Sequence, residues 1–240
     1  MTVKDHYDNH LGDFYSWMAG DFQSKQQEFA QFLSEHSINP TSTKIAIDLG
    51  AGHGIQTVSL AQRGYNVIAV DFNKQLLDEL AINTSGLHAD IINGDIKDVK
   101  QFGGRHPELI VCCGDTLTQL DSIEEIRTLL SDCAAILDSN GKLILSFRDY
   151  STELTGDNRF IAVKGDDTKI LTCCLDFENE KVRVTDLLYC KTDNVWQMKV
   201  SSYYKVRVSP QAIIDILLEN GLTIDFNGIV NRMVTVIAGK

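Results

Sequence analysis

The chain has 240 residues, and its 22 Lys and Arg against 33 Asp and Glu give it a formal net charge of −11. So acidic a chain repels phosphate backbones and anionic lipid surfaces, and we expect neither nucleic acid nor a membrane as its partner. The polar N-terminus and the lack of a long apolar run predict a cytoplasmic protein. Its six cysteines have no metal-ligand spacing, so we expect buried reduced thiols and no metal site.

Residues 1–40 are predicted to form a helical segment ahead of the main sheet, one that covers the ligand site as a lid. An apolar stripe at helical spacing predicts a helix over 21–36, and Asn39-Pro40-Thr41 then breaks the chain. The stretch from Tyr7 to Trp17 is rich in aromatic residues.

Residues 41–150 alternate between strand and helix patterns and form the predicted core domain. The expected strands are 44–49, 65–70, 88–92, 108–113 and 142–147, with helices at 55–63, 74–82 and 122–137. Such alternation predicts a parallel sheet with helices on both faces.

The period changes after residue 150. In 151–208 the alternating runs 170–177, 182–190 and 195–208 have no helix between them, which predicts an antiparallel β insertion. In 209–240, Ser209-Pro210 starts a last helix, and two strands, 222–226 and 233–237, close the sheet. The predicted fold is therefore α/β: a Rossmann-like, doubly wound, seven-stranded, mostly parallel sheet with an antiparallel insertion after strand five.

The run from Lys44 to Gly54, KIAIDLGAGHG, is a short apolar strand followed by three glycines and a helix start. Such a turn lets a ligand lie against bare backbone at a helix N-terminus. Asp71 stands at the tip of the next strand, about 20 residues further on, where an acidic side chain hydrogen-bonds a ribose diol. The pattern predicts a cofactor that contains adenosine.

The glycine spacing distinguishes between such cofactors. A dinucleotide turn needs a third glycine where this chain has Ile55, and no Gly-Lys-Ser/Thr phosphate loop occurs. Asp48, just before the turn, suits a ligand with an amino group better than a pyrophosphate. S-adenosylmethionine has an ammonium, a sulfonium and a ribose, and it has no phosphate.

Four segments in chain order resemble the motifs of class I S-adenosylmethionine-dependent methyltransferases. They are Ile45 to Gly54, Asp71-Phe72, Gly94-Asp95-Ile96 and Leu109 to Leu120. The last segment resembles small-molecule enzymes of the glycine/sarcosine N-methyltransferase kind. The resemblance extends from about Tyr7 to Arg148 and resumes in the last helix and strands.

This resemblance implies methyl transfer from S-adenosylmethionine to a small-molecule acceptor with an amine, hydroxyl or carboxyl nucleophile. Two alternatives stay open at this point. One is a non-catalytic S-adenosylmethionine-binding protein. The other is a nicotinamide-dependent oxidoreductase, which Ile55 disfavours.

The residues expected to bind the cofactor lie at the strand ends of these motifs. They are Asp48, Gly50, Ala51, Gly52, Gly54, Asp71, Phe72, Asp95, Ile96, Cys113, Gly114 and Asp115. Asp48 is expected to accept a hydrogen bond from the amino group of the cofactor, and Asp71 from both ribose hydroxyls. The resemblance implies that the residues at Asp95 and Ile96 contact the adenine. Core packing remains an alternative for Phe72, and a turn cap remains one for Asp115.

No residue is assigned as the general base, and the candidates for a catalytic role are Tyr15, Asp115 and Arg148. Arg148 suits a substrate carboxylate, although pairing with Asp149 or Asp115 is equally compatible with its position. The lid candidates are Tyr7, Tyr15 and Trp17, whose aromatic faces attract a sulfonium. The insertion is expected to roof the acceptor pocket or to contact a second subunit in a homodimer.

Overall fold

The computed structural model describes residues 2–240 and contains two β-sheets. The larger has the order β10-β11-β5-β4-β1-β2-β3. Its strands are β1 (Ile45–Leu49), β2 (Asn66–Asp71), β3 (Ala89–Asn93), β4 (Leu109–Cys112), β5 (Lys142–Phe147), β10 (Thr223–Val230) and β11 (Met233–Gly239). Strands β1 to β5 pair in parallel, and β11 pairs antiparallel with both β5 and β10. The predicted fold class is confirmed.

Helices cover both faces of this sheet. On one face lie α3 (Phe22–Glu35), α4 (Ile55–Gln62) and α5 (Lys74–Asn83), and on the other lie α6 (Ile123–Ile136), α7 (Pro210–Glu219) and the 3-10 segment η2 (Ile96–Arg105). Capping side chains set the starts of five of them. Each accepts from a backbone N–H of the first turn, and the capping residues are Asp21, Asn73, Asp95, Ser122 and Ser209. Within the described chain, no helix is long and apolar enough to cross a membrane.

The second sheet, which we call the small sheet, follows β5 and is antiparallel throughout. Its strands are β6 (Phe160–Gly165), β7 (Lys169–Phe177), β8 (Lys181–Thr192) and β9 (Val195–Val206), in that order across the sheet. A short 3-10 turn, η4 (Gly156–Arg159), leads into β6. The sequence analysis predicted three of these strands and missed β6, an edge strand whose side chains are mostly exposed.

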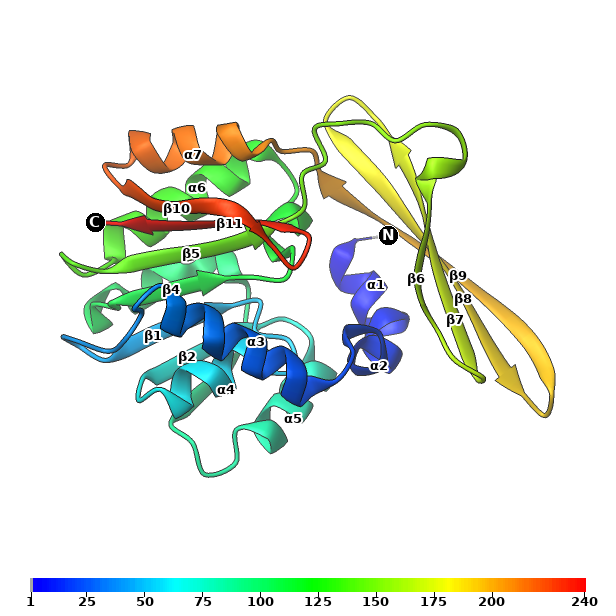
Figure 1. Ribbon diagram of the computed structural model, residues 1–240, viewed down its shortest axis with the longest axis horizontal. Coiled ribbons are helices and arrows are strands. Elements are labelled where there is room, and N and C mark those ends of the chain that lie inside the picture. Colours follow the sequence, from blue (N-terminus) through cyan, green and yellow to red (C-terminus); the bar gives the residue numbers. More distant parts are fainter. Residues whose placement is uncertain (1) are drawn as a thin grey trace.

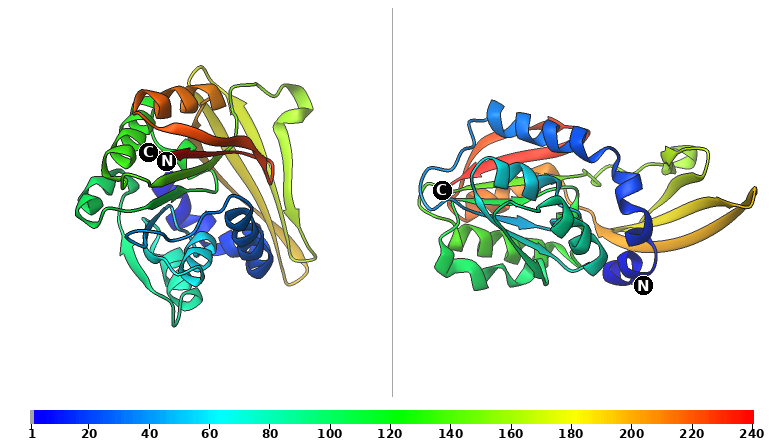
Figure 2. Two further views of the ribbon diagram at one scale, coloured as in Figure 1. Left: turned by 60° about the vertical axis from the view of Figure 1, so that its left-hand side comes forward. Right: turned by 90° about the horizontal axis from the view of Figure 1, so that it is seen from below.

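The N-terminal residues lie between the two sheets. Figure 1 and the right-hand view of Figure 2 show α1 (Val3–Asn9) and α2 (Tyr15–Ala19), joined by the 3-10 turn η1 (Leu11–Phe14), between the core and the small sheet. Leu11 and Phe14 pack there against Leu171 and Leu188 of the small sheet. The first 40 residues therefore divide into two parts: the segment α1 to α2, which is the predicted lid and which we call the lid from here on, and a core helix, α3.

Glu108, just before β4, fixes the linker that leads into β1. Its buried carboxylate accepts hydrogen bonds from the backbone N–H groups of Thr41, Ser42 and Lys44 and from two hydroxyls. Burial alone would raise the pKa of Glu108, but the hydrogen bonds from Ser42 and Thr41 outweigh it and lower the pKa.

We expect Glu108→Gln to lower the free energy of unfolding at pH 7 by about 1.5–3 kcal/mol, because an amide nitrogen cannot accept from the linker. A lowered pKa stabilises the fold above the unfolded carboxyl pKa, and this stability is lost as the pH falls through the folded value. The difference between variant and wild type should therefore shrink in acid. Urea unfolding across this pH range tests this, with the exposed Glu124→Gln as control, and a difference independent of pH would contradict it.

Candidate functional site

The glycine turn and Asp71 form one hydrogen-bonded unit. Gly50, Gly52 and Gly54 have φ of +75°, +53° and +101°, values that residues with a side chain rarely adopt. The Asp71 carboxylate accepts from the Gly52 N–H at 2.8 Å with one oxygen and from the Asn73 N–H at 2.8 Å with the other. A carboxylate can accept more hydrogen bonds than these two. Burial raises the pKa of Asp71, and the backbone bonds from Asn73, Gly52 and Phe72 oppose that rise.

Asp48 lies beneath this turn. Its side chain is buried and accepts from the Thr57 hydroxyl at 2.6 Å. Burial is the main reason that its pKa rises to about 7; the Thr57 bond lowers the pKa, and the nearby Asp71 raises it further. Asp48 is therefore a carboxyl group that a nearby cation would ionise.

The residues predicted to lie near the adenine, Phe72, Asp95 and Ile96, have different environments. Phe72 lies 5.4 Å, centroid to centroid, from the edge-on Tyr7 ring of the lid. It borders a cavity of about 410 Å³ lined by Lys4, Asp8, Phe72, Asn73, Lys74, Gln75, Asp78 and Asn93. Asp95 has a half-exposed side chain and caps η2 by accepting from the Lys97 N–H, whereas Ile96 is buried in the core.

The loop after β4 approaches the glycine turn. The Gly114 N–H donates to the Ser146 hydroxyl at 3.0 Å, and Cys113 just before it is buried. A Cβ at Gly114 would meet no atom within 4 Å, whereas one at Gly50 would collide with the side chain of Thr116. The loop thus forms a wall of the turn and leaves open space beside Gly114.

Both carboxylate oxygens of Asp115 have hydrogen-bond or ion-pair partners. Asp115 has φ of +73°, and its carboxylate accepts from the Arg148 N–H at 2.8 Å, the Thr118 hydroxyl at 2.9 Å and the Tyr150 hydroxyl at 3.0 Å, with an ion pair to Lys205. The Arg148 guanidinium, half exposed, approaches it to only 3.9 Å at Nε. Of these two candidate catalytic groups, Arg148 rather than Asp115 thus has unused hydrogen-bonding capacity.

Two of the three lid aromatics reach the candidate site. The Tyr15 ring lies 3.7 Å from where a Gly52 Cβ would stand, and the Tyr7 hydroxyl accepts from Gln119 at 3.1 Å. Burial, and secondarily the Asp71 charge, raises the pKa of Tyr15 to about 12, so it is a neutral phenol at neutral pH. Trp17 instead faces the small sheet, where its indole N–H donates to Asp166.

Sequence reasoning missed Lys205 and Tyr150, which bind Asp115 from the small sheet and the linker that leads to it. A strand that alternates polar and apolar residues ordinarily buries the apolar ones, yet in Lys205-Val206-Arg207-Val208 Lys205 is 7% exposed and Val206 is 3% exposed. A single alternating strand carries no signal for a partner that lies 90 residues earlier in the chain.

Residues 46–141 match the methyltransferase domain family. The chain carries a class I S-adenosylmethionine-dependent methyltransferase domain. Over 61% of its length it is 25% identical to the glycine/sarcosine N-methyltransferase of Aphanothece halophytica, and over 61% it is 27% identical to the same enzyme of Parasynechococcus marenigrum. These stretches cover 57% and 49% of the two relatives, so the chain spans about half the length of the curated relatives it matches.

A solved structure shares the fold of nearly the whole chain, beyond the matched domain. The CcbJ methyltransferase from Streptomyces caelestis superposes with a TM-score of 0.81 and covers 98% of each chain, at 15% identity. At that identity the likeness concerns the fold, and it includes the small sheet as well as the core.

S-adenosylmethionine is the cofactor of this domain class, and the observed turn fits it. The Asp71 carboxylate can accept further hydrogen bonds, as a ribose diol requires. The position beside Gly114 is open, and the three atoms nearest to a Cβ at Gly52 belong to Tyr15. An aromatic face and the Asp48 carboxyl close by suit the sulfonium and the ammonium.

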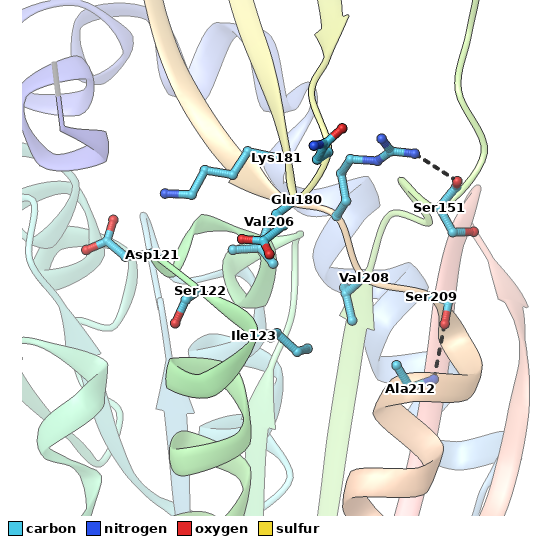
Figure 3. Close-up of a pocket in the computed structure, with 12 residues that line it drawn as sticks. Asp121, Ser122, Ile123, Ser151, Glu180, Lys181, Val206, Val208, Ser209 and Ala212 are labelled. Carbon is cyan, nitrogen blue, oxygen red and sulfur yellow. Dashed lines mark hydrogen bonds between the residues drawn. The ribbon is translucent and has the colours of Figure 1, made fainter.

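A second cavity, of about 380 Å³, lies where the small sheet meets the starts of α6 and α7 (Figure 3). Lys181 enters it from the small sheet, opposite Asp121 and Ser122 of the core. The Ser122 and Ser209 hydroxyls here cap their own helices. This cavity lies between the small sheet and the core, and the glycine turn does not line it.

Gly50 and Gly52 should respond differently to alanine. Both have positive φ, which costs an L-residue about 1–2 kcal/mol, but only at Gly50 does the Cβ collide with Thr116. We expect Gly50→Ala to lower the free energy of unfolding by at least about 1 kcal/mol more than Gly52→Ala. Chemical denaturation of both variants measures this. Equal losses would contradict the close contact between the turn and the loop after β4.

Proposed function

We propose that this chain transfers a methyl group from S-adenosylmethionine to a small-molecule acceptor held between the core and the small sheet. The observation that carries the proposal is the Asp71 carboxylate, which bonds the glycine turn with one oxygen and the turn after β2 with the other and can accept further hydrogen bonds. Bound there, S-adenosylmethionine supplies an electrophilic methyl group on a sulfonium. Alignment of the acceptor with that methyl group is the main task left to the protein.

The cofactor contacts follow from the geometry of the edge. Asp71 accepts from the ribose hydroxyls, Phe72 faces the adenine, and the backbone of Gly52 and Gly114 lies along the methionine end. Tyr7 and Tyr15 cover the cofactor from the lid and exclude water, which strengthens electrostatic interactions inside.

The acceptor is a small molecule with an acidic group. Arg148 extends a half-exposed guanidinium at the end of β5, the same edge at which Gly114 lies, and a guanidinium binds a carboxylate with two parallel hydrogen bonds. The names of the two relatives, whose substrates glycine and sarcosine are amino acids, support such an acceptor. The neutral phenol of Tyr15, with a pKa of about 12, acts as a hydrogen-bond donor, whereas the Tyr150 hydroxyl already donates to Asp115.

The activity is tested by incubating the protein with S-adenosylmethionine labelled in the methyl group and with separate pools of amino acids, amines lacking an acid group, and carboxylic acids. Label should enter the amino-acid pool. Transfer to the amines alone would contradict the role of Arg148, and the absence of transfer to any pool would contradict the proposed activity.

Asp71→Ala should weaken binding of S-adenosylhomocysteine by about 1.5–3 kcal/mol, the range for hydrogen bonds to a charged group. Calorimetry measures the affinity, and Asp90→Ala on β3, an exposed carboxylate that lines neither cavity, is the matched control, expected to bind like the wild type. A folded Asp71→Ala protein with wild-type affinity would show that this carboxylate does not hold the ribose.

A second copy of the chain is the proposed partner of the small sheet's outer face. Of the thirteen large hydrophobic side chains exposed among residues 2–240, ten lie between 160 and 204. Ile170, Tyr189 and Met198 are neighbours across β7, β8 and β9, on the face turned away from the lid. Exposed apolar patches of this kind mark interaction sites.

Size and charge favour pairing with itself. Four strands of 6 to 12 residues present a face of roughly 500 Å² in projection, and protruding side chains bring its accessible surface near the ~800 Å² per partner of a stable interface. Despite the net charge of −11, acidic groups at this face have partners: Asp176 pairs with Arg159 and Arg183, and Glu178 accepts from the Tyr204 hydroxyl. Two such faces do not repel each other.

We therefore expect twice the 26.7 kDa chain mass in solution, and a monomer at micromolar concentration for Val200→Lys, which places a charge on this face. Light scattering coupled to size exclusion measures the mass. Ile82→Lys, at an even more exposed apolar site on α5, is the control and should stay dimeric. A monomeric wild type would contradict the pairing.

A further inference from the structure

Lys205 of β9 places a charged group inside the molecule. Its side chain is 9% exposed, its ammonium pairs with Asp115, and it lies 5.6 Å from the centre of the Tyr150 ring and 5.7 Å from that of Tyr203. Burial alone would lower the pKa of Lys205, but Asp115 raises it well above the usual value. The small sheet thus presents a permanent cation to the loop after β4.

Asp115 occupies a position from which it controls that loop. Its φ of +73° is unfavourable for a non-glycine residue, and such a conformation persists where the surroundings enforce it. The enforcing groups come from Arg148, Thr118, Tyr150 and Lys205, and of these only Lys205 belongs to the small sheet.

The two neighbours of Asp115 in the chain lie in different surroundings. Gly114 has open space where a Cβ would stand, and the Thr116 side chain borders the glycine turn, because it occupies the space that a Cβ at Gly50 would need. Any displacement of Asp115 therefore also displaces Gly114 and the Thr116 side chain that contacts Gly50. Lys205 lies on the small sheet, yet it contacts Asp115, which is the chain neighbour of both Gly114 and Thr116.

We propose that Lys205 is a positioning residue that, through its ion pair with Asp115, fixes the 113–116 loop against the methionine end of the cofactor. This inference rests on the proposed placement of the cofactor, with the ribose at Asp71 and the amino-acid end beside Gly114. It couples the small sheet, which covers the acceptor, to the half of the cofactor that carries the methyl group.

Two ligands separate this role from a general loss of structure. S-adenosylhomocysteine extends to the methionine end, whereas 5′-deoxy-5′-methylthioadenosine lacks the amino-acid part and reaches only the adenosine side. Lys205→Met should weaken S-adenosylhomocysteine about tenfold, within the range of coupling in a shared network, and leave methylthioadenosine binding unchanged. Calorimetry with both ligands measures this.

Lys199→Met is the matched control, because Lys199 lies on the same face of β9 and is exposed. It should bind both ligands as the wild type does. Should Lys205→Met fail to fold because it leaves Asp115 without its counter-charge, the double variant Asp115→Asn/Lys205→Met removes both charges and carries the same expectation.

Unchanged S-adenosylhomocysteine affinity in a folded Lys205 variant would overturn the proposal, and so would an equal weakening of both ligands. The wild type is titrated first. If it does not bind S-adenosylhomocysteine, the proposed function itself fails; if it binds and only the variant result is negative, the role of Lys205 alone is wrong.

Discussion

The Asp71 carboxylate is the constraint on which the candidate site depends. It bonds the Gly52 N–H on one side and the Asn73 N–H on the other, and so joins the two turns that follow β1 and β2. Without that bridge, three successive positive-φ glycines would have far more conformational freedom than a binding surface permits. The same bridge keeps the carboxylate in one orientation, which is what recognition of two adjacent hydroxyls requires.

The rest of the site is built in layers over this edge. The lid contacts both neighbours, since Tyr7 meets Phe72 on the core side and His6 stacks on Tyr203 of the small sheet at 4.2 Å. The Asp115–Lys205 pair joins core and small sheet directly. Buried charges lose hydration, so each partner is tolerated because the other is present. Lid, core and small sheet are thus held in one arrangement by polar contacts as well as by apolar packing.

Much of this architecture could be predicted from the sequence because it depends on local patterns. Strand and helix periods, the three glycines and Asp71 all lie within short stretches, and parallel strands bring their ends to one edge. The structure bears this out in the bond from Gly52 to Asp71, 19 residues apart. Helix starts were likewise marked by local residues such as Ser209 and Pro210.

What could not be predicted depends on distant partners. The direction of Trp17 is set by Asp166 and Lys164 of the small sheet, and the burial of Lys205 is set by Asp115. Strand β6 was missed because its place is decided by pairing with β7 and its side chains are mostly exposed. The sequence likewise left the surroundings of Asp115 open between a turn cap and the acceptor site, and its four donors come from residues up to 90 positions away.

The most direct test of the central claim is a calorimetric titration of the wild-type protein with S-adenosylhomocysteine and, separately, with NADH. The glycine turn with Ile55 in place of a third glycine, and with Asp71 at its edge, predicts saturable binding of one S-adenosylhomocysteine per chain and no binding of NADH. Binding of NADH without S-adenosylhomocysteine, or of neither, would contradict the account.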